Sequence, residues 1–345
     1  MRLIRFAHPD PLTDRKQYGP QMRPVFLPFA GCPHRCAFCG QHLQTGQTAQ
    51  PLETHYESLR AHLEQVALNA STRTLELAFY GGTFTALPEP WPERFLKLAA
   101  LHRASGLVVR VRCSTRPDHT DPAMLARLKG LGLDMVELGI QSFDSAALRA
   151  SGRGYDSETA LQGCENVRVA GLDLGVQLMP GLPGDQPGTF QRDVARTLAL
   201  QPEAVRLYPC LVIDGTLLAR QWREKTYRPW SLARTRQELA AALGALWSRN
   251  IPVIRIGLHP EPDLLPAILD GPWHPALGQM VRSLALFDHV RARAANLGPG
   301  PNILFAPRRF SGEVMGHGAE LRQAWRKAGI TIQQHDGQRF GILSK

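Results

Sequence analysis

The chain contains 345 residues, 43% of them hydrophobic, and carries a formal net charge of +10. This length suits one large domain with a smaller one, and six cysteines are too sparse for a disulfide framework. The first sixteen residues lack the apolar core of a signal peptide, and no apolar run reaches the ~18 residues of a membrane span. We therefore expect a soluble, cytoplasmic protein with no membrane partner.

Short apolar runs alternate with amphipathic stretches along most of the chain. Strands are expected at 25–30, 74–82, 107–114, 134–142, 172–181 and 204–212, and helices at 53–69, 93–104, 121–130, from 143 to about 170, 187–199 and 231–248. Strands that each lead into a helix imply parallel β/α units with right-handed crossovers. We predict an α/β fold in which residues 1–258 form a partial (β/α)6 barrel.

A sequence motif follows the end of each predicted strand. The motifs are CPHRCAFC, GGTFT, CSTRPD, LGIQSFD, MPGLPG and YPCLVIDGT. In parallel β/α barrels the chemistry lies at the C-terminal ends of the strands. A single glycine pair marks no more than a tight turn, but six motifs at one rim predict a single ligand-filled mouth.

The first motif places three cysteines within eight residues. Cys32, Cys36 and Cys39 have the spacing C-x3-C-x2-C, and the aromatic residue Phe38 precedes the third cysteine. Iron–sulfur cubanes usually take four cysteines. Three thiolates leave one iron without a protein ligand, so a small molecule can chelate and react there.

Zinc is the alternative for this loop. Structural zinc takes four ligands, usually as two separated pairs. The remaining cysteines are isolated from the loop and from one another: Cys113, Cys164 and Cys210. A Cys3His site would have to include His34 or His42.

The stretch from Val25 to about Arg255 resembles the radical S-adenosylmethionine (radical SAM) domain of the Elongator catalytic subunit and its prokaryotic relatives. The matching segments are CPHRCAFC, YGGTFTALP, STRPD, VELGIQSFD, LMPGLPG and LYPCLVIDGTLLARQW. The cysteine spacing belongs to the whole superfamily, whereas GGTF, TRPD and YPCLVIDGT belong to the Elongator-like branch. The oxygen-independent coproporphyrinogen oxidases share the cysteine spacing and a GIQSFD-like segment.

This resemblance implies the cofactors and the residues that hold them. Cys32, Cys36 and Cys39 would ligate a 4Fe–4S cluster, and the amino and carboxylate groups of S-adenosylmethionine (SAM) would take its open iron. One electron, from a reductant such as flavodoxin or ferredoxin, would cleave SAM to methionine and a 5′-deoxyadenosyl radical. The implied SAM contacts are the backbone at Phe38 for adenine, Gly81, Gly82 and Thr83 for the amino group, and Gln141 and Arg153 for the ribose and carboxylate.

Two features depart from the Elongator pattern. Ser114 stands where relatives usually have an acidic residue before TRPD, so this contact to SAM differs. The Elongator subunit continues into an acetyltransferase domain, whereas fewer than ninety residues follow His259. We therefore expect no acetyl-CoA binding, and no carboxymethylation of tRNA by this chain itself.

The C-terminal part predicts a second, smaller unit. Residues 259–298 are expected to form a linker and a helix, and residues 299–345 a basic α/β module. Its order of strand, helix, GHGA loop (316–319), helix and strand resembles a minimal KH module, whose GXXG loop grips single-stranded nucleic acid. Ala319 replaces the final glycine of that loop.

Positive charge is concentrated at this end of the chain. Residues 271–345 contain ten Lys and Arg against four Asp and Glu, which is the electrostatic footprint of a polyanion partner. The residues expected to meet RNA phosphates are Arg322, Arg326 and Lys327. The alternative is a small α/β cap that only packs on the barrel.

These patterns predict a radical SAM enzyme that modifies RNA, with tRNA as the first candidate substrate. One alternative is a radical SAM enzyme that acts on a small molecule such as a tetrapyrrole. Another is a non-catalytic iron–sulfur protein that binds RNA. The cluster and SAM carry the chemistry, so the residues around them do not name the substrate.

Overall fold

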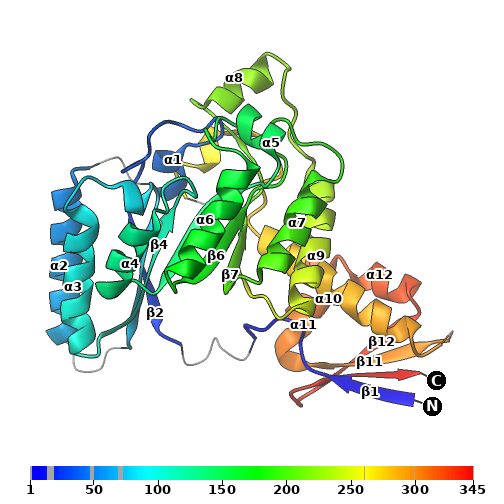
Figure 1. Cartoon of the computed structure of the whole chain (residues 1–345). Helices are drawn as coiled ribbons and strands as arrows, with labels where there is room; N and C mark the ends of the chain where they lie inside the picture. Colours follow the sequence, from blue (N-terminus) through cyan, green and yellow to red (C-terminus); the bar gives the residue numbers. More distant parts are fainter. Residues whose placement is uncertain are drawn as a thin grey trace.

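The computed structural model describes residues 2–13, 19–46, 50–68, 73–259, 261–298 and 300–344. A large parallel sheet with helices around it forms most of the molecule, and a smaller sheet lies beside its lower end (Figure 1). Among the described residues, no helix combines the length and the apolar character needed to cross a bilayer.

The larger sheet is parallel throughout and has the strand order β2–β3–β4–β5–β6–β7–β9. Its strands are β2 (Gln21–Phe26), β3 (Leu75–Tyr80), β4 (Val108–Thr115), β5 (Met135–Gln141), β6 (Asp173–Leu178), β7 (Ala204–Leu207) and β9 (Val253–Ile256). Strands β2 and β9 are its two edges, so the barrel stays open on one side. The predicted partial β/α barrel is confirmed, with seven strands in place of six.

Two strands differ from the prediction for local reasons. The strand β9 was not expected because it has only four residues, too few for a strand pattern to identify it. The strand β2 begins at Gln21 and ends at Phe26, whereas a strand was predicted at 25–30. Its first two residues are exposed at the sheet edge, so this half of the strand lacks an apolar pattern.

Helices follow the strands and pack on the outer face of the sheet (Figure 1). The longer ones are α2 (Leu52–Leu68), α3 (Trp91–Ala104), α4 (Pro122–Gly130), α6 (Ser157–Val169), α7 (Thr189–Leu200) and α9 (Leu232–Ser248). At the upper end lie α1 (Gln41–Thr45), α5 (Ser145–Ala150), α8 (Leu217–Arg223) and the strand pair β8 (Val212–Ile213) and β10 (Ile268–Asp270).

Apolar side chains on alternate strand positions face these helices. Leu77, Val136 and Val205 are fully buried in one continuous core between the sheet and the helices. Successive side chains of a strand point to opposite faces. The residues between these apolar positions therefore point into the barrel.

The smaller sheet joins the two ends of the chain. It has the order β1–β13–β11–β12, with β1 (Arg2–Phe6), β11 (Asn302–Pro307), β12 (Ile330–His335) and β13 (Phe340–Ser344). Strand β13 runs antiparallel to both β1 and β11, while β11 and β12 are parallel. Figure 1 shows the N- and C-termini side by side. The predicted division at residue 258 therefore does not describe β1, which pairs with the opposite end of the chain.

The segment between β11 and β12 has the predicted order of helix, loop and helix. It consists of η3 (Arg308–Phe310), α11 (Ser311–Met315), η4 (His317–Ala319) and α12 (Arg322–Lys327). The indole of Trp325 in α12 is buried and donates a hydrogen bond to the carbonyl of Val314 in α11 at 2.7 Å. The likeness to a KH module stays a prediction.

Helix α10 (Leu277–Ala295) belongs to both parts of the molecule. In its first half, Leu277 and Val281 lie in the core of the barrel. In its second half, Phe287 and Val290 lie in the core of the smaller sheet, where the Phe287 ring meets Trp325 edge to face at 4.6 Å. This helix, expected within a linker at 259–298, is thus a shared structural element.

Candidate functional site

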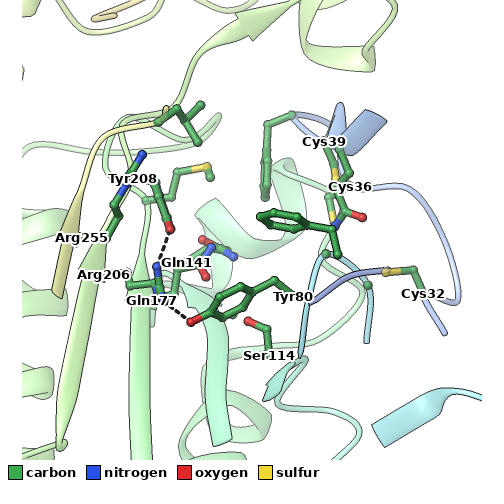
Figure 2. Close-up of a pocket in the computed structure, with 18 of the residues that line it drawn as sticks. Cys32, Cys36, Cys39, Tyr80, Ser114, Gln141, Gln177, Arg206, Tyr208 and Arg255 are labelled. Carbon is green, nitrogen blue, oxygen red and sulfur yellow. Dashed lines mark hydrogen bonds between the residues drawn. The ribbon is translucent and has the colours of Figure 1, made fainter. Parts of the chain in front are cut away.

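A cavity of about 530 Å³ opens at the C-terminal ends of the barrel strands (Figure 2). Its wall includes most of the residues expected to bind a cluster or SAM: Cys32, Cys36, Phe38, Cys39, Gly81, Gly82, Ser114, Gln141 and Arg153. Thr83 is fully buried beside the wall. The rim motifs therefore meet around one cavity, while the individual roles of these residues stay predictions.

The three cysteines lie on one loop between β2 and α1. All three are free and partly buried, and Figure 2 shows Cys36 close to Cys39, with Cys32 further along the loop. Burial, followed by the neighbouring thiols of Cys36 and Cys32, raises the pKa of Cys39 to about 12. Metal coordination would therefore have to deprotonate this thiol outright.

The zinc alternative involves two histidines near the cysteine loop. Among the described residues, no three His, Cys, Asp or Glu side chains, the loop cysteines included, are arranged to hold one metal ion, and this applies equally to zinc and to a cluster. Nε2 of His34 lies 2.9 Å from the carbonyl oxygen of Gly152. The ring of His42 lies 6.0 Å from that of Phe29.

Two backbone segments pack directly against each other beneath the cysteine loop. The amide of Thr83 donates a hydrogen bond to the carbonyl of Ala30 at 2.8 Å. A Cβ atom on Gly82 would lie 2.0 Å from the same carbonyl oxygen, and a Cβ on Gly31 would lie 2.3 Å from the Thr83 carbonyl oxygen. Packing against the Ala30 carbonyl therefore requires a glycine at position 82. This requirement is independent of the contact with SAM that the sequence predicted for Gly82.

Gln141 has an unusual conformation at the end of β5. Its φ is +68°, in a region that non-glycine residues adopt rarely. One extra residue in β5 between Leu138 and Gln141 forms a bulge against β6, and such bulges re-aim side chains beside functional sites. The buried Oε1 of Gln141 has no hydrogen-bond partner among the described residues, which marks it as an acceptor for a ligand.

Arg153 reaches a cysteine rather than open space. Its Nη1 donates to Cys36 Sγ at 3.1 Å, its Nε donates to the Tyr155 hydroxyl at 2.9 Å, and its Nη2 donates to the Gly139 carbonyl at 2.5 Å. The guanidinium is thus fixed beside an expected cluster ligand. Its expected contact with SAM stays a prediction.

Charged, amide and phenolic side chains also line the cavity, and none of them was among the predicted site residues. They are Tyr80, Arg112, Gln177, Arg206, Tyr208 and Arg255. The buried carboxylate of Glu137 joins several of them: it forms ion pairs with Arg206 and, at 3.4 Å, with Arg112. It also accepts a hydrogen bond from the Tyr80 hydroxyl at 2.9 Å.

A signal for these residues was present in the sequence. Single charged or amide residues interrupt apolar strand segments: VRVRC contains Arg112, MVELG contains Glu137 and AVRLY contains Arg206. A strand buried on both faces is usually a continuous apolar run. The interruptions therefore indicated side chains that point into a polar cavity.

Comparison with known families agrees with this geometry. The family model described as Radical SAM superfamily matches residues 26–196, and the model described as Radical_SAM C-terminal domain matches residues 202–285. The chain belongs to the radical SAM superfamily. It is therefore an enzyme of the class that the cysteine spacing predicted.

Individual relatives cover the barrel rather than the whole chain. A tRNA uridine(34) acetyltransferase of Methanocaldococcus infernus is 27% identical over 243 residues, which are 58% of this chain and 45% of that protein. Elongator complex protein 3 of Danio rerio is 30% identical over 230 residues, 58% of this chain and 41% of that protein. This radical SAM chain thus spans about half the length of the curated relatives it matches.

A solved structure shows the same fold. The archaeal Methanocaldococcus infernus Elp3 with an N-terminal deletion superposes with a TM-score of 0.58 at 22% sequence identity, over 79% of this chain and 63% of that chain. The hydrogenase maturase HydG superposes with a TM-score of 0.53 at 14% identity, over 78% of this chain and 56% of that chain.

The radical SAM superfamily implies a 4Fe–4S cluster and SAM, and the residues present fit both. Three free thiols on one loop line a cavity, and thiolates are the ligands of such clusters. The unpartnered Oε1 of Gln141 in the same wall offers a hydrogen-bond acceptor to SAM.

The residues expected to bind RNA lie apart from this cavity. Arg322, Arg326 and Lys327 are exposed on α12, and within the described part of the chain none of them has an ion pair. The preceding GHGA loop faces the barrel instead: the His317 ring lies 5.2 Å from that of His274. Figure 1 shows α12 near the smaller sheet, away from the cysteine loop beside α1.

Cys36→Ala should abolish the iron–sulfur cluster, whereas Cys164→Ala should keep it. Cys36 lines the cavity, while Cys164 is fully buried in the apolar core between α6 and the sheet. After anaerobic reconstitution, iron analysis and visible absorbance should give about four irons per chain for the wild type and Cys164→Ala. Stoichiometric zinc without an iron chromophore would contradict this assignment.

Gly82→Ala should reduce iron incorporation and SAM binding together. Its new Cβ would collide with the Ala30 carbonyl, so the two backbone segments would have to separate and the cysteine loop would shift. The matched control is Gly244→Ala in α9, where a Cβ meets open space. Unchanged iron content and SAM affinity in Gly82→Ala would show that this contact does not position the loop.

Proposed function

We propose that this radical SAM enzyme cleaves SAM reductively in the barrel cavity and uses the resulting radical to modify RNA, with tRNA as the substrate. The observation that carries the first part is the meeting of three free thiols and an unpartnered Gln141 in one cavity. The substrate is inferred from the exposed cations on α12 and from the names of the relatives.

The residues of the chain have distinct tasks in this proposal. The thiolates of Cys32, Cys36 and Cys39 hold the cluster, and Gln141 and the Gly81 backbone orient SAM beside it. When bound, the cluster supplies the electron that cleaves SAM to methionine and a 5′-deoxyadenosyl radical.

The open side of the barrel suits a large substrate. Pro24 and Phe26 of the edge strand β2 and Ile254 and Arg255 of the edge strand β9 all line the cavity. Since these two strands are not paired, a nucleotide can enter between them while the rest of the polymer stays outside. A reductant such as flavodoxin or ferredoxin is the expected electron donor.

An extended substrate also explains the position of the basic helix. Helix α12 and the cysteine loop lie at different ends of the molecule (Figure 1), so only a ligand of macromolecular length could contact both. Phosphate contacts from exposed Arg and Lys position a nucleic acid without reading its sequence. The basic helix would thus hold the RNA while the cavity receives the nucleotide.

Cells without the gene should lack a modified tRNA nucleoside that wild-type cells contain. The measurement is mass spectrometry of nucleosides from purified tRNA, with the Cys36→Ala gene returned as a control that should not restore the modification. The purified, reduced enzyme should form 5′-deoxyadenosine from SAM in the absence of oxygen. Identical nucleoside profiles with intact SAM cleavage would favour the small-molecule alternative, and absence of SAM cleavage would favour a non-catalytic protein.

An Arg322→Ala/Arg326→Ala double variant should bind tRNA more weakly and with a flatter salt dependence. Each lost phosphate contact lowers the slope of log K against log salt concentration by roughly one unit. The matched control is Arg60→Ala/Arg94→Ala on α2 and α3, which removes the same charge where both arginines pair with glutamates. If the two double variants had equal tRNA affinity and equal iron content, α12 would not bind RNA, and the C-terminal module would be only a structural cap.

A further inference from the structure

Two arginines lie directly opposite each other on neighbouring strands inside the barrel. Arg206 of β7 and Arg255 of β9 are partners in the strand register, and both line the cavity. Directly opposite residues on paired strands share one face, and like charges in these positions destabilise the pairing. The arrangement therefore requires negative charge on the same face of the sheet.

Arg206 already has its negative partner. Its guanidinium forms an ion pair with Glu137, which is 2% exposed, and donates a hydrogen bond to the Tyr80 hydroxyl. Its Nη1 also donates to the Tyr208 hydroxyl at 3.2 Å. Since Glu137 is further shared with Arg112, it has no capacity left to neutralise a third arginine.

Arg255 has no such partner in the described part of the chain. Its Nε donates to the Gly257 carbonyl at 3.0 Å, which fixes the guanidinium plane. Within the described residues no carboxylate lies at ion-pair distance from it, and Glu261, the carboxylate in the cavity wall, lies 3.3 Å from Nδ1 of His259. A partly buried cation without a counter-charge is unfavourable, so its amino groups are available to an anion in the cavity.

Further hydrogen-bonding groups flank this arginine. Gln177 of β6 is the register partner of Arg206, so Gln177, Arg206 and Arg255 form one row across three strands. The Tyr208 hydroxyl accepts from Arg206 and keeps its own proton to donate. Figure 2 shows Arg255 and Tyr208 across the cavity from Cys36 and Cys39.

This position separates the row from the expected SAM carboxylate. That carboxylate would bind at the open iron, beside the cysteine loop, whereas Arg255 lies on the opposite wall. The anion expected to bind Arg255 therefore belongs to a second ligand in the cavity, which is the substrate.

We propose that Arg255, assisted by Tyr208, binds an oxyanion group of the substrate, a phosphate or a carboxylate, inside the barrel. A guanidinium fork binds both groups through two parallel hydrogen bonds. The inference rests on the proposed function and deepens it: for an RNA substrate the oxyanion is a backbone phosphate of the nucleotide that enters between β2 and β9.

The test measures ligand binding to the reconstituted, oxidised full chain with SAM present, so that no turnover occurs. Isothermal titration calorimetry would use three probes: uridine 5′-monophosphate, uridine and succinate. The wild type should bind the monophosphate more tightly than uridine. Arg255→Gln should weaken monophosphate binding about tenfold or more, the range for a lost hydrogen bond to a charged group, while uridine binding stays the same.

Two further variants make the result specific. Arg255→Lys should restore part of the affinity, because it keeps the charge but not the fork. Arg234→Gln removes the same charge from an arginine that stacks on Trp230, outside the cavity wall, and should bind the monophosphate as the wild type does. Iron content and SAM affinity in the same preparations show whether each variant is folded and loaded.

The possible outcomes separate the inference from the proposed function. Arg255-dependent binding of succinate without binding of the monophosphate would support the oxyanion site and weaken the RNA proposal. The inference would be overturned if the wild type bound neither the monophosphate nor succinate, or if Arg255→Gln bound them as tightly as the wild type does. A loss of SAM affinity in Arg255→Gln, with monophosphate binding unchanged, would assign Arg255 to SAM and also overturn it.

Discussion

The contact between two stretches of backbone, beneath the cysteine loop, determines the geometry of the whole site. The carbonyl of Ala30 accepts the amide of Thr83 and lies against Gly82, where no side chain fits. In the same way, Gly31 of the cysteine loop packs against the Thr83 carbonyl, so each segment places a glycine against a carbonyl of the other. The loop with the thiols is thereby fixed to the end of β3, and Thr83 places its hydroxyl 3.4 Å from Cys32 Sγ.

The barrel interior places charge where many barrels place branched apolar side chains. Arg112, Glu137 and Arg206 form a network at its centre, and their desolvation is unfavourable unless they are well paired. Leucine or valine at these positions would avoid the cost of desolvating charge, but they would offer a ligand neither charge nor hydrogen bonds. The polar interior thus makes the empty barrel less stable, but it allows the barrel to bind a charged ligand.

Local sequence patterns were sufficient for much of this organisation. The strands β3 to β7 and the helices between them follow from short apolar runs and amphipathic stretches, and the cysteine spacing indicated the cofactor chemistry. The pairing of β1 with β13 could not be predicted, because it joins residues at opposite ends of the chain and no local periodicity encodes it. For the same reason the opposition of Arg206 and Arg255 depends on a strand register that a single sequence does not contain.

Helix α10 has a consequence for how this protein can change over evolutionary time. Its first turns pack in the barrel core and its last turns in the core of the smaller sheet. A substitution in either core that displaces the helix therefore also affects packing in the other core. Recombination near residue 258 could therefore not transfer the C-terminal module between proteins as an independent unit. An exchange would have to carry α10 and the N-terminal strand with it, because α10 packs in both cores and β1 pairs with β13 at the opposite end of the chain.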